Sequence, residues 1–127
     1  MIFVDTNVIM YAVGGEHPLR AKAQQFFEDA VRQGTPLVTS AEVLQELLHV
    51  YLSVRRAEAL EAATILVEGL IPTVWSVDAE DVRLAATLAE AHPSLGARDL
   101  VHLASCTRRE VTRVKTFDRA LAAAFPG

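Results

Sequence analysis

The sequence predicts a three-layer α/β/α sandwich, in which helices cover both faces of a short, mostly parallel sheet. Short apolar segments alternate with longer amphipathic ones along the chain, and parallel neighbours need crossover connections of this kind. Hydrophobic residues make up 51% of the 127 residues, which is enough for one compact core. We therefore expect a single domain over residues 1–127, whose strand order the sequence leaves open.

The first half of the chain contains two expected strands separated by helical segments. Gly14 and Gly15 end the first helical segment, Pro18 starts the next, and Gly34 ends it. Ser40 is a plausible cap for the helix after the second strand. The expected segments are a strand over 2–4, a helical turn over 8–13, a helix from Pro18 up to Gly34, a strand over 37–39, and helices over 41–54 and 55–70.

The second half repeats this alternation. Pro72 precedes the third strand, Asp78 caps the following helix, and a break at residues 92–96 separates it from the next helix. The expected segments are a strand over 73–77, a helix to about residue 89, a helix over 98–108, a strand over 113–117 and a last helix over 119–125.

Composition excludes several classes of protein. No apolar run approaches the roughly 20 residues that cross a bilayer, and the amino terminus lacks signal-peptide features, so we expect a cytoplasmic protein with no membrane contact. The single cysteine, Cys106, argues against a zinc site and is expected to be a small buried residue. The net charge of −4 disfavours phosphate binding through basic residues, although acids that hold divalent cations reverse the local field.

Two aspartates follow strands that are far apart in the sequence. Asp5 follows Ile2–Val4 directly, and Asp118 follows the strand that ends at Phe117. The carboxyl ends of parallel strands share one edge of the sheet, where such folds bind their ligands. Each aspartate is also explained as a turn or helix-cap residue. Their matching positions favour a shared site.

Two further acids lie at the margins of apolar helix faces. Glu46 lies at the edge of the apolar face of helix 41–54, whereas Glu42 points roughly opposite and is expected to be solvated. Asp99 lies at the edge of the apolar face of helix 98–108, where a capping or helix-dipole contribution explains it equally well. Four converging carboxylates repel one another unless protons or cations intervene, and hard oxygen ligands select Mg²⁺ or Mn²⁺. Such ions activate water for attack on a phosphodiester.

Four segments of the sequence resemble PIN-domain ribonucleases of the VapC toxin type. They are FVDTNVIMYA, TSAEVLQELLHVY, GARDLVHLA and VKTFDRAL, and together they extend over essentially the whole chain. The resemblance implies that Asp5, Glu46, Asp99 and Asp118 are the catalytic, metal-binding acids. It also implies that Asn7 and Thr116 support the site by orienting ligands or water, although Asn7 is alternatively a helix cap.

The same resemblance implies a function and partners. It implies Mg²⁺-dependent endonucleolytic cleavage of RNA, with Mn²⁺ as a substitute, leaving a 5′-phosphate and a 3′-hydroxyl. It also implies a homodimer and inhibition by a cognate antitoxin encoded beside the toxin. Two alternatives remain open: a PIN-domain nuclease that processes RNA without an inhibitor, and a non-catalytic binding module whose acids are helix caps.

Several other residues allow more than one interpretation. Arg98 either reaches a substrate phosphate, pairs with a neighbouring acid or is solvated, and His102 is expected to be exposed or hydrogen-bonded rather than a ligand. Trp75 is expected in the core or in a subunit contact. The one basic concentration forms either an RNA-facing rim or a solvated surface; it comprises Arg108, Arg109, Arg113, Lys115 and Arg119.

Overall fold

The computed structural model describes residues 1–126. Strands and helices alternate as the sequence predicts. The strands are β1 (Ile2–Val4), β2 (Leu37–Ser40), β3 (Thr73–Trp75) and β4 (Val114–Lys115). The helices are α1 (Thr6–Val13), α2 (Pro18–Gln33), α3 (Ala41–Ser53), α4 (Ala57–Leu70), α5 (Ala79–Leu88), α6 (Ala97–Arg108) and α7 (Arg119–Ala124).

All strand pairings in the sheet are parallel, and the strand order is β3-β2-β1-β4. In the register of β1 against β4, Val4 lies opposite Lys115. The two strands therefore end at the same level although they come from opposite ends of the chain. This order brings the residues that follow β1 and β4 together at the carboxyl edge of the sheet.

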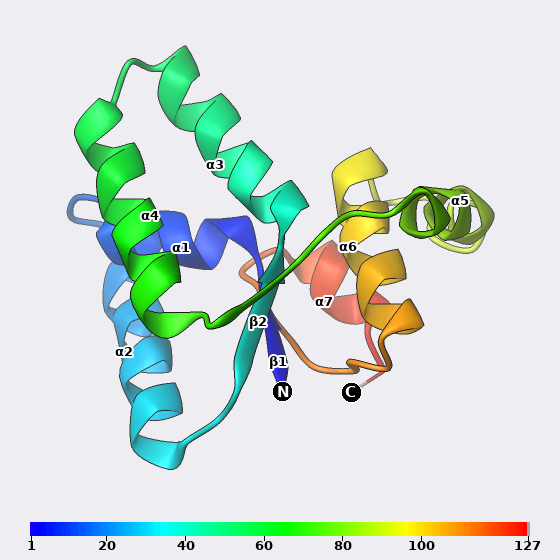
Figure 1. Cartoon of the computed structure of the whole chain (residues 1–127), viewed down its shortest axis with the longest axis horizontal. Helices are drawn as coiled ribbons and strands as arrows, with labels where there is room; N and C mark the ends of the chain where they lie inside the picture. Colours follow the sequence, from blue (N-terminus) through cyan, green and yellow to red (C-terminus); the bar gives the residue numbers. More distant parts are fainter. Residues whose placement is uncertain (127) are drawn as a thin grey trace.

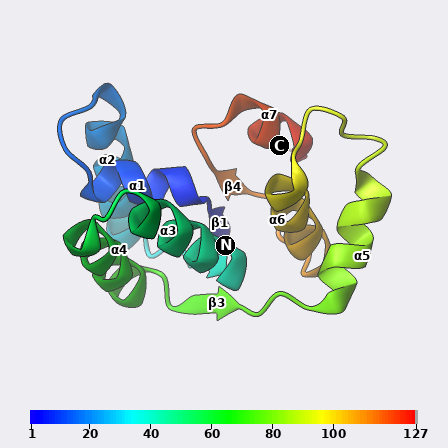
Figure 2. The ribbon, with the colours of Figure 1, turned by 90° about the horizontal axis from the view of Figure 1, so that it is seen from above.

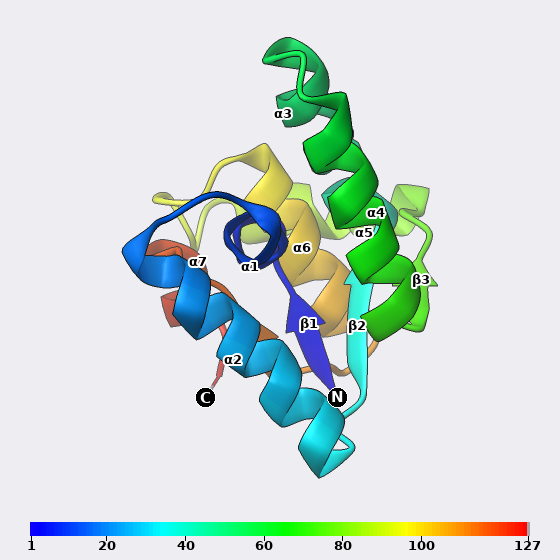
Figure 3. The ribbon, with the colours of Figure 1, turned by 90° about the vertical axis from the view of Figure 1, so that its left-hand side faces the viewer.

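The helices form two layers, one on each face of the sheet. Helices α1 to α4 pack on one another on one face, and α5 to α7 pack together on the other (Figure 2). The three-layer α/β/α prediction is therefore confirmed. The α3–α4 pair extends beyond the carboxyl ends of the strands (Figures 1 and 3). Among residues 1–126, no helix combines the length and apolar character that crossing a membrane requires.

Strands β1 and β2 and the inward faces of the helices form the core. Phe3, Val4 and Val38 have no solvent exposure, as expected for parallel strands covered on both faces. Trp75 stacks on Phe3 with ring centroids 5.9 Å apart, which confirms its expected packing in the core. Cys106 is fully buried, as predicted, and burial raises the pKa of its thiol to about 12.

The boundaries of several elements differ from the sequence prediction. The first helical segment is a complete helix that begins at Thr6, because Asp5 caps it by accepting a hydrogen bond from the Thr6 N–H. Helix α4 begins at Ala57 rather than residue 55, since Arg55 has a φ of 53° in the turn before it. The predicted strands over 73–77 and 113–117 shorten to Thr73–Trp75 and Val114–Lys115. Propensity alone marks strand ends poorly because pairing decides them.

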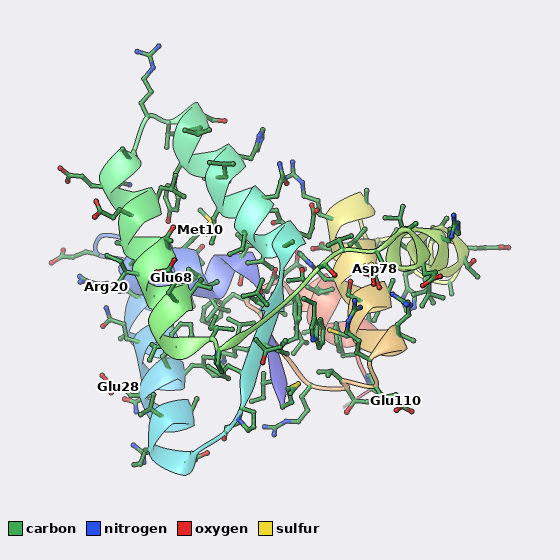
Figure 4. The ribbon with its side chains drawn as sticks, in the orientation of Figure 1. Met10, Arg20, Glu28, Glu68, Asp78 and Glu110 are labelled. Carbon is green, nitrogen blue, oxygen red and sulfur yellow. The ribbon has the colours of Figure 1, made fainter. Side chains whose placement is uncertain are left out.

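Ion pairs fasten α5 to α6. The carboxylate of Asp81 on α5 is buried and accepts hydrogen bonds from Arg108 at 2.6 Å and Arg109 at 2.9 Å, both at the end of α6. Asp78, labelled in Figure 4 beside α6, and the exposed Glu80 complete the cluster. We call these five residues the α5–α6 clamp.

Two residues of the basic concentration belong to the clamp. The guanidinium carbon of Arg109 also lies 4.8 Å from the centre of the Trp75 ring. Arg108 and Arg109 pair with acids on α5 while their side chains remain 29% and 22% exposed, so they lie at the surface in ion pairs, and the RNA-facing rim stays a prediction. The sequence does not reveal the pairing because the partners lie 27 to 31 residues away.

The clamp makes stability depend on pH in the acid range. Burial opposes the ionised form of Asp81, but the bonds from Arg109, the Asp78 N–H and Arg108 outweigh it and lower its pKa from 3.8 to about 2. A lowered folded-state pKa stabilises the fold above about pH 4, and this contribution is lost as the pH falls towards 2. We expect urea denaturation of Asp81→Asn to lack this part of the wild-type pH dependence.

Removal of the Asp81 carboxylate tests the clamp directly. Asp81→Ala is expected to lower the free energy of unfolding at pH 7 by about 3–5 kcal/mol, because two arginines lose their shared buried partner. The matched control is Glu80→Ala, whose side chain is 67% exposed and whose loss should cost less than about 1 kcal/mol. Equal losses in the two variants would contradict the clamp.

Candidate active site

The acids selected from the sequence come from four different elements. Asp5 follows β1, Asp118 follows β4, Glu46 lies on α3, and Asp99 lies in the first turn of α6. Helices α1 and α3 leave the carboxyl ends of β1 and β2, and α6 begins at the same level (Figure 1). The topology therefore directs all four acids towards one edge of the sheet.

Asp5 is the most buried of these acids, with 4% exposure. Its Oδ1 accepts a hydrogen bond from the Thr6 N–H, and its Oδ2 accepts one from the Thr116 hydroxyl, both at 2.7 Å. Burial raises the pKa of Asp5, while His102, Thr116 and Thr6 oppose the rise. The carboxylate is therefore held in one orientation within a poorly solvated environment.

Asn7 and Thr116 join the start of α1 to the loop after β4. The Thr116 hydroxyl donates to Asp5 and accepts from the Asn7 side-chain amide at 3.2 Å and the Asp118 N–H at 3.0 Å. The Asn7 side-chain oxygen accepts from the Phe117 N–H at 3.1 Å. Asn7 lies inside α1 and the N-cap is Asp5, so the alternative of Asn7 as a helix cap is wrong.

Glu46 is partly buried, as expected from its position at the edge of an apolar face. Its Oε1 lies 2.8 Å from Nε2 of His102 on α6, and its side chain is 16% exposed. Burial raises the pKa of Glu46, but the hydrogen bond and charge of His102 outweigh this effect and lower it. Glu46 thus remains ionised and faces the interior of the site.

The pKa of Asp99 reflects its burial and its closeness to the other acids. Burial raises its pKa to about 6, and the negative charges of Asp5, Asp118 and Glu46 raise it as well, against the opposing effect of His102. Mutual repulsion of this kind requires the carboxylates to be close in a medium that screens them poorly. The four acids therefore form one electrostatically coupled group.

Asp118 has two roles in the structure. Its Oδ1 caps α7 by accepting from the Ala120 and Leu121 N–H groups, which is the capping interpretation of the sequence. Its charge also acts on Asp99. One carboxylate oxygen is thus used by the helix, while the side chain still contributes negative charge to the site.

The arginines and the second glutamate lie around this group. Arg98 is 49% exposed, and its Nε lies 4.0 Å from Glu42 Oε1, whereas Arg119 is exposed at the first position of α7. Glu42 keeps a side-chain exposure of 23% and lies beside Arg98 at the start of α6. Helix periodicity alone does not reveal this contact.

His102 lies among these acids, although the sequence predicted no role for it at the site. It is fully buried, and its Nε2 lies 3.7 Å from Asp5 Oδ1 as well as 2.8 Å from Glu46. His102 was expected to be either exposed or hydrogen-bonded, and it is hydrogen-bonded. The signal was its position three residues after Asp99, on nearby faces of one helix.

The donor set fits a hard divalent cation. Carboxylate oxygens that repel one another are the ligands that Mg²⁺ and Mn²⁺ prefer. Within residues 1–126, however, no three Asp, Glu, His or Cys side chains already surround a common point at metal-ligand spacing. Hydrogen bonds to Thr116, His102 and the α7 backbone hold the carboxylates, so binding an ion requires small side-chain movements.

Acids gathered at the carboxyl edge of a parallel α/β/α sandwich suit a domain that cleaves phosphodiesters with the help of divalent cations. The PIN domain matches residues 2–125, and the chain therefore belongs to the PIN-domain family. Its relatives place it within that family among the VapC ribonucleases.

Two relatives and one solved structure illustrate the similarity. Ribonuclease VapC23 of Mycobacterium tuberculosis is 57% identical over 125 residues, which is 98% of each chain. VapC ribonuclease Mb1869c of Mycobacterium bovis is 39% identical over 127 residues, covering 100% of this chain and 96% of the relative. The crystal structure of M. tuberculosis VapC20, a sarcin–ricin loop cleaving toxin, has a TM-score of 0.80 at 20% identity, covering 99% of this chain and 97% of that chain.

The Thr116 hydroxyl is expected to be the main hydrogen-bonding link between β1 and β4 at the site. Thr116→Val removes three hydrogen bonds and leaves Asp5, Asn7 and the Asp118 N–H without this partner. The expected loss in the free energy of unfolding is about 1–3 kcal/mol, measured by urea denaturation. Thr116→Ser keeps the hydroxyl and serves as the matched control; an equally large loss in this variant would contradict the assignment.

Proposed function

We propose that residues 1–127 form a single metal-dependent endoribonuclease domain that hydrolyses RNA phosphodiester bonds. Asp5, Glu46, Asp99 and Asp118 are proposed to hold one or two Mg²⁺ ions, for which Mn²⁺ substitutes. The supporting observation is the gathering of these acids at one edge of the sheet: Asp5 and Glu46 both face His102 Nε2, and burial together with the charges of Asp5, Asp118 and Glu46 raises the pKa of Asp99. Family membership agrees with this chemistry.

In this proposal, the protein's own side chains hold the acids in position and supply the negative charge of the site. Asp5 is fixed from both sides by Thr6 and Thr116, and Glu46 is fixed by His102. Asn7 supports the loop that carries Thr116 and Asp118. A divalent cation, when bound, activates water and stabilises the charge that develops on the phosphate. The protein thus contributes negative charge at a site whose acids are held close together.

We propose that RNA approaches past Arg98 and Arg119. Both arginines lie on elements that carry a site acid or follow one, and both are substantially exposed. Clustered acids repel a phosphodiester, so nearby cations are needed to bind it. The logarithm of the RNA affinity falls linearly with the logarithm of the salt concentration. For single-stranded RNA, each phosphate that a protein cation neutralises makes this slope steeper by about 0.7. Arg98→Ala and Arg119→Ala are each expected to make this slope shallower by about that amount.

We further propose a cytoplasmic toxin with a cognate antitoxin. The relatives carry the VapC name, and the net charge of −4 leaves RNA binding to the site and its rim. Expression of the chain should arrest growth, and co-expression of a small neighbouring open reading frame should relieve the arrest. Growth without arrest would instead favour a nuclease that processes RNA without an inhibitor.

A homodimer is proposed on the basis of the outer face of α3. Leu44, Leu48 and Leu52 repeat every four residues and are 39%, 45% and 63% exposed. Three exposed leucines on one face of a helix fit an interaction surface, and a two-fold axis would pair this face with itself. Sedimentation equilibrium is expected to give the dimer mass for the wild type and the monomer mass for Leu48→Lys. A dimeric Leu48→Lys variant would place the interface elsewhere.

The nuclease proposal is tested by substitution of one acid. Asp5→Asn preserves shape but removes the charge, and RNA cleavage with Mg²⁺ should fall by more than the roughly 10- to 100-fold typical of losing an outer-shell partner. The wild type with EDTA should fall equally. The matched control is Glu28→Gln, an exposed acid on the outer side of α2 (Figure 4). Undiminished cleavage by Asp5→Asn would refute the assignment.

A further inference from the structure

His102 connects three elements at the centre of the site. It lies on α6, and its ring packs 5.3 Å from that of Phe3 on β1. Its Nε2 faces Glu46 on α3 at 2.8 Å and Asp5 after β1 at 3.7 Å. A fully buried imidazole thus lies between two acids that come from different elements of the fold.

The hydrogen bonding of the ring indicates its function. Nδ1 is buried and has no hydrogen-bond partner within the described part of the chain, whereas Nε2 has a short contact with Glu46. An ionised carboxylate only accepts, so Nε2 carries the proton of this bond. The same nitrogen has no lone pair for a metal while it donates. Nε2 is therefore no metal ligand while this bond holds, and through it His102 acts on the site by way of Glu46.

Glu46 needs such a restraint more than Asp5 and Asp118 do. Its helix, α3, extends past the end of the sheet (Figure 3), whereas Asp5 and Asp118 lie close behind strands and are held by backbone N–H groups. A glutamate side chain also has one more rotatable bond than an aspartate. The bond from His102 joins α3 to α6 across the two helical layers and selects one position for the Glu46 carboxylate.

We infer that His102 is a positioning residue that holds Glu46 in place for binding a divalent cation together with Asp5. The inference rests on the proposed function, in which these acids are ligands. Outer-shell partners that orient a ligand commonly contribute 10- to 100-fold to metal affinity. Removing His102 should therefore weaken the metal site without altering the set of ligands.

The test measures Mn²⁺ binding to the purified full chain, using the electron paramagnetic resonance signal of free Mn²⁺. His102→Leu is expected to raise the Kd for Mn²⁺ by about 10- to 100-fold. His102→Gln places an amide N–H near the position of Nε2 and should restore much of the affinity that the Leu variant loses. His102→Asn places its amide near Nδ1 and should not restore it. The Gln and Asn pair keeps the test informative if the Leu variant does not fold.

A matched control separates positioning from stability. Leu103→Ala truncates the neighbouring buried residue of α6 and should lower the stability of the fold while leaving the Kd for Mn²⁺ unchanged. RNA cleavage by His102→Leu should be slow at low Mn²⁺ and recover at saturating Mn²⁺, with an unchanged KM for RNA. This recovery is not expected if His102 only supports packing.

Three outcomes would overturn the inference. The first is wild-type Mn²⁺ affinity in folded His102→Leu, and the second is an equal loss in the Gln and Asn variants. The third is a matching loss of affinity in Leu103→Ala. Failure of the proposed function looks different: the wild type would bind Mn²⁺ in a His102-dependent way and yet leave RNA intact.

Discussion

The structure depends on one electrostatic constraint, the crowding of carboxylates at the carboxyl edge of a parallel sheet. Asp5 is almost fully buried there, and the surrounding acids contribute to raising the pKa of Asp99 to about 6. Such repulsion destabilises the fold unless positive groups offset it. In the chain itself, His102 and the hydroxyl of Thr116 supply part of the compensation. The remaining negative potential is what makes the edge attractive to a divalent cation.

Opposite charges are paired at the end of α6, whereas negative charge is in excess nearer its start. At its end, Arg108 and Arg109 saturate the buried Asp81, and the resulting clamp fixes α5 against the second helical layer. Nearer its start, Asp99 and His102 lie close to Asp5 and Glu46, and this group holds more acidic than basic side chains. The satisfied cluster stabilises the layer that carries the unsatisfied one. This division is consistent with the general rule that functional sites retain electrostatic strain that the rest of the fold supports.

The sequence predicted much of the fold because local signals agreed with the tertiary structure. Helix α2 begins at Pro18 and ends before Gly34, which has a φ of 66°. Helix α5 begins with the capping box of Asp78 and Asp81. The predictions were incomplete where long-range packing decided the outcome. Arg98 of α6 lies beside Glu42, and Arg108 and Arg109 pair with acids on α5. Ser40 occupies the N-cap of α3 as predicted, but without a side-chain cap bond. Helical periodicity describes one helix and carries no information about the neighbour that covers it.

The sequence by itself determined the alternation of strands and helices, the apolar core and the identity of the acids at strand ends, because these features follow from periodicity and the local chemistry of caps and turns. Only the tertiary structure decided the strand order, the closeness of Asp5 to Thr116 across 111 residues, and the placement of His102 between Glu46 and Asp5. These depend on which strands pair and which helices pack across the sheet. Such choices reflect the summed burial of the whole chain and not the preference of any one segment.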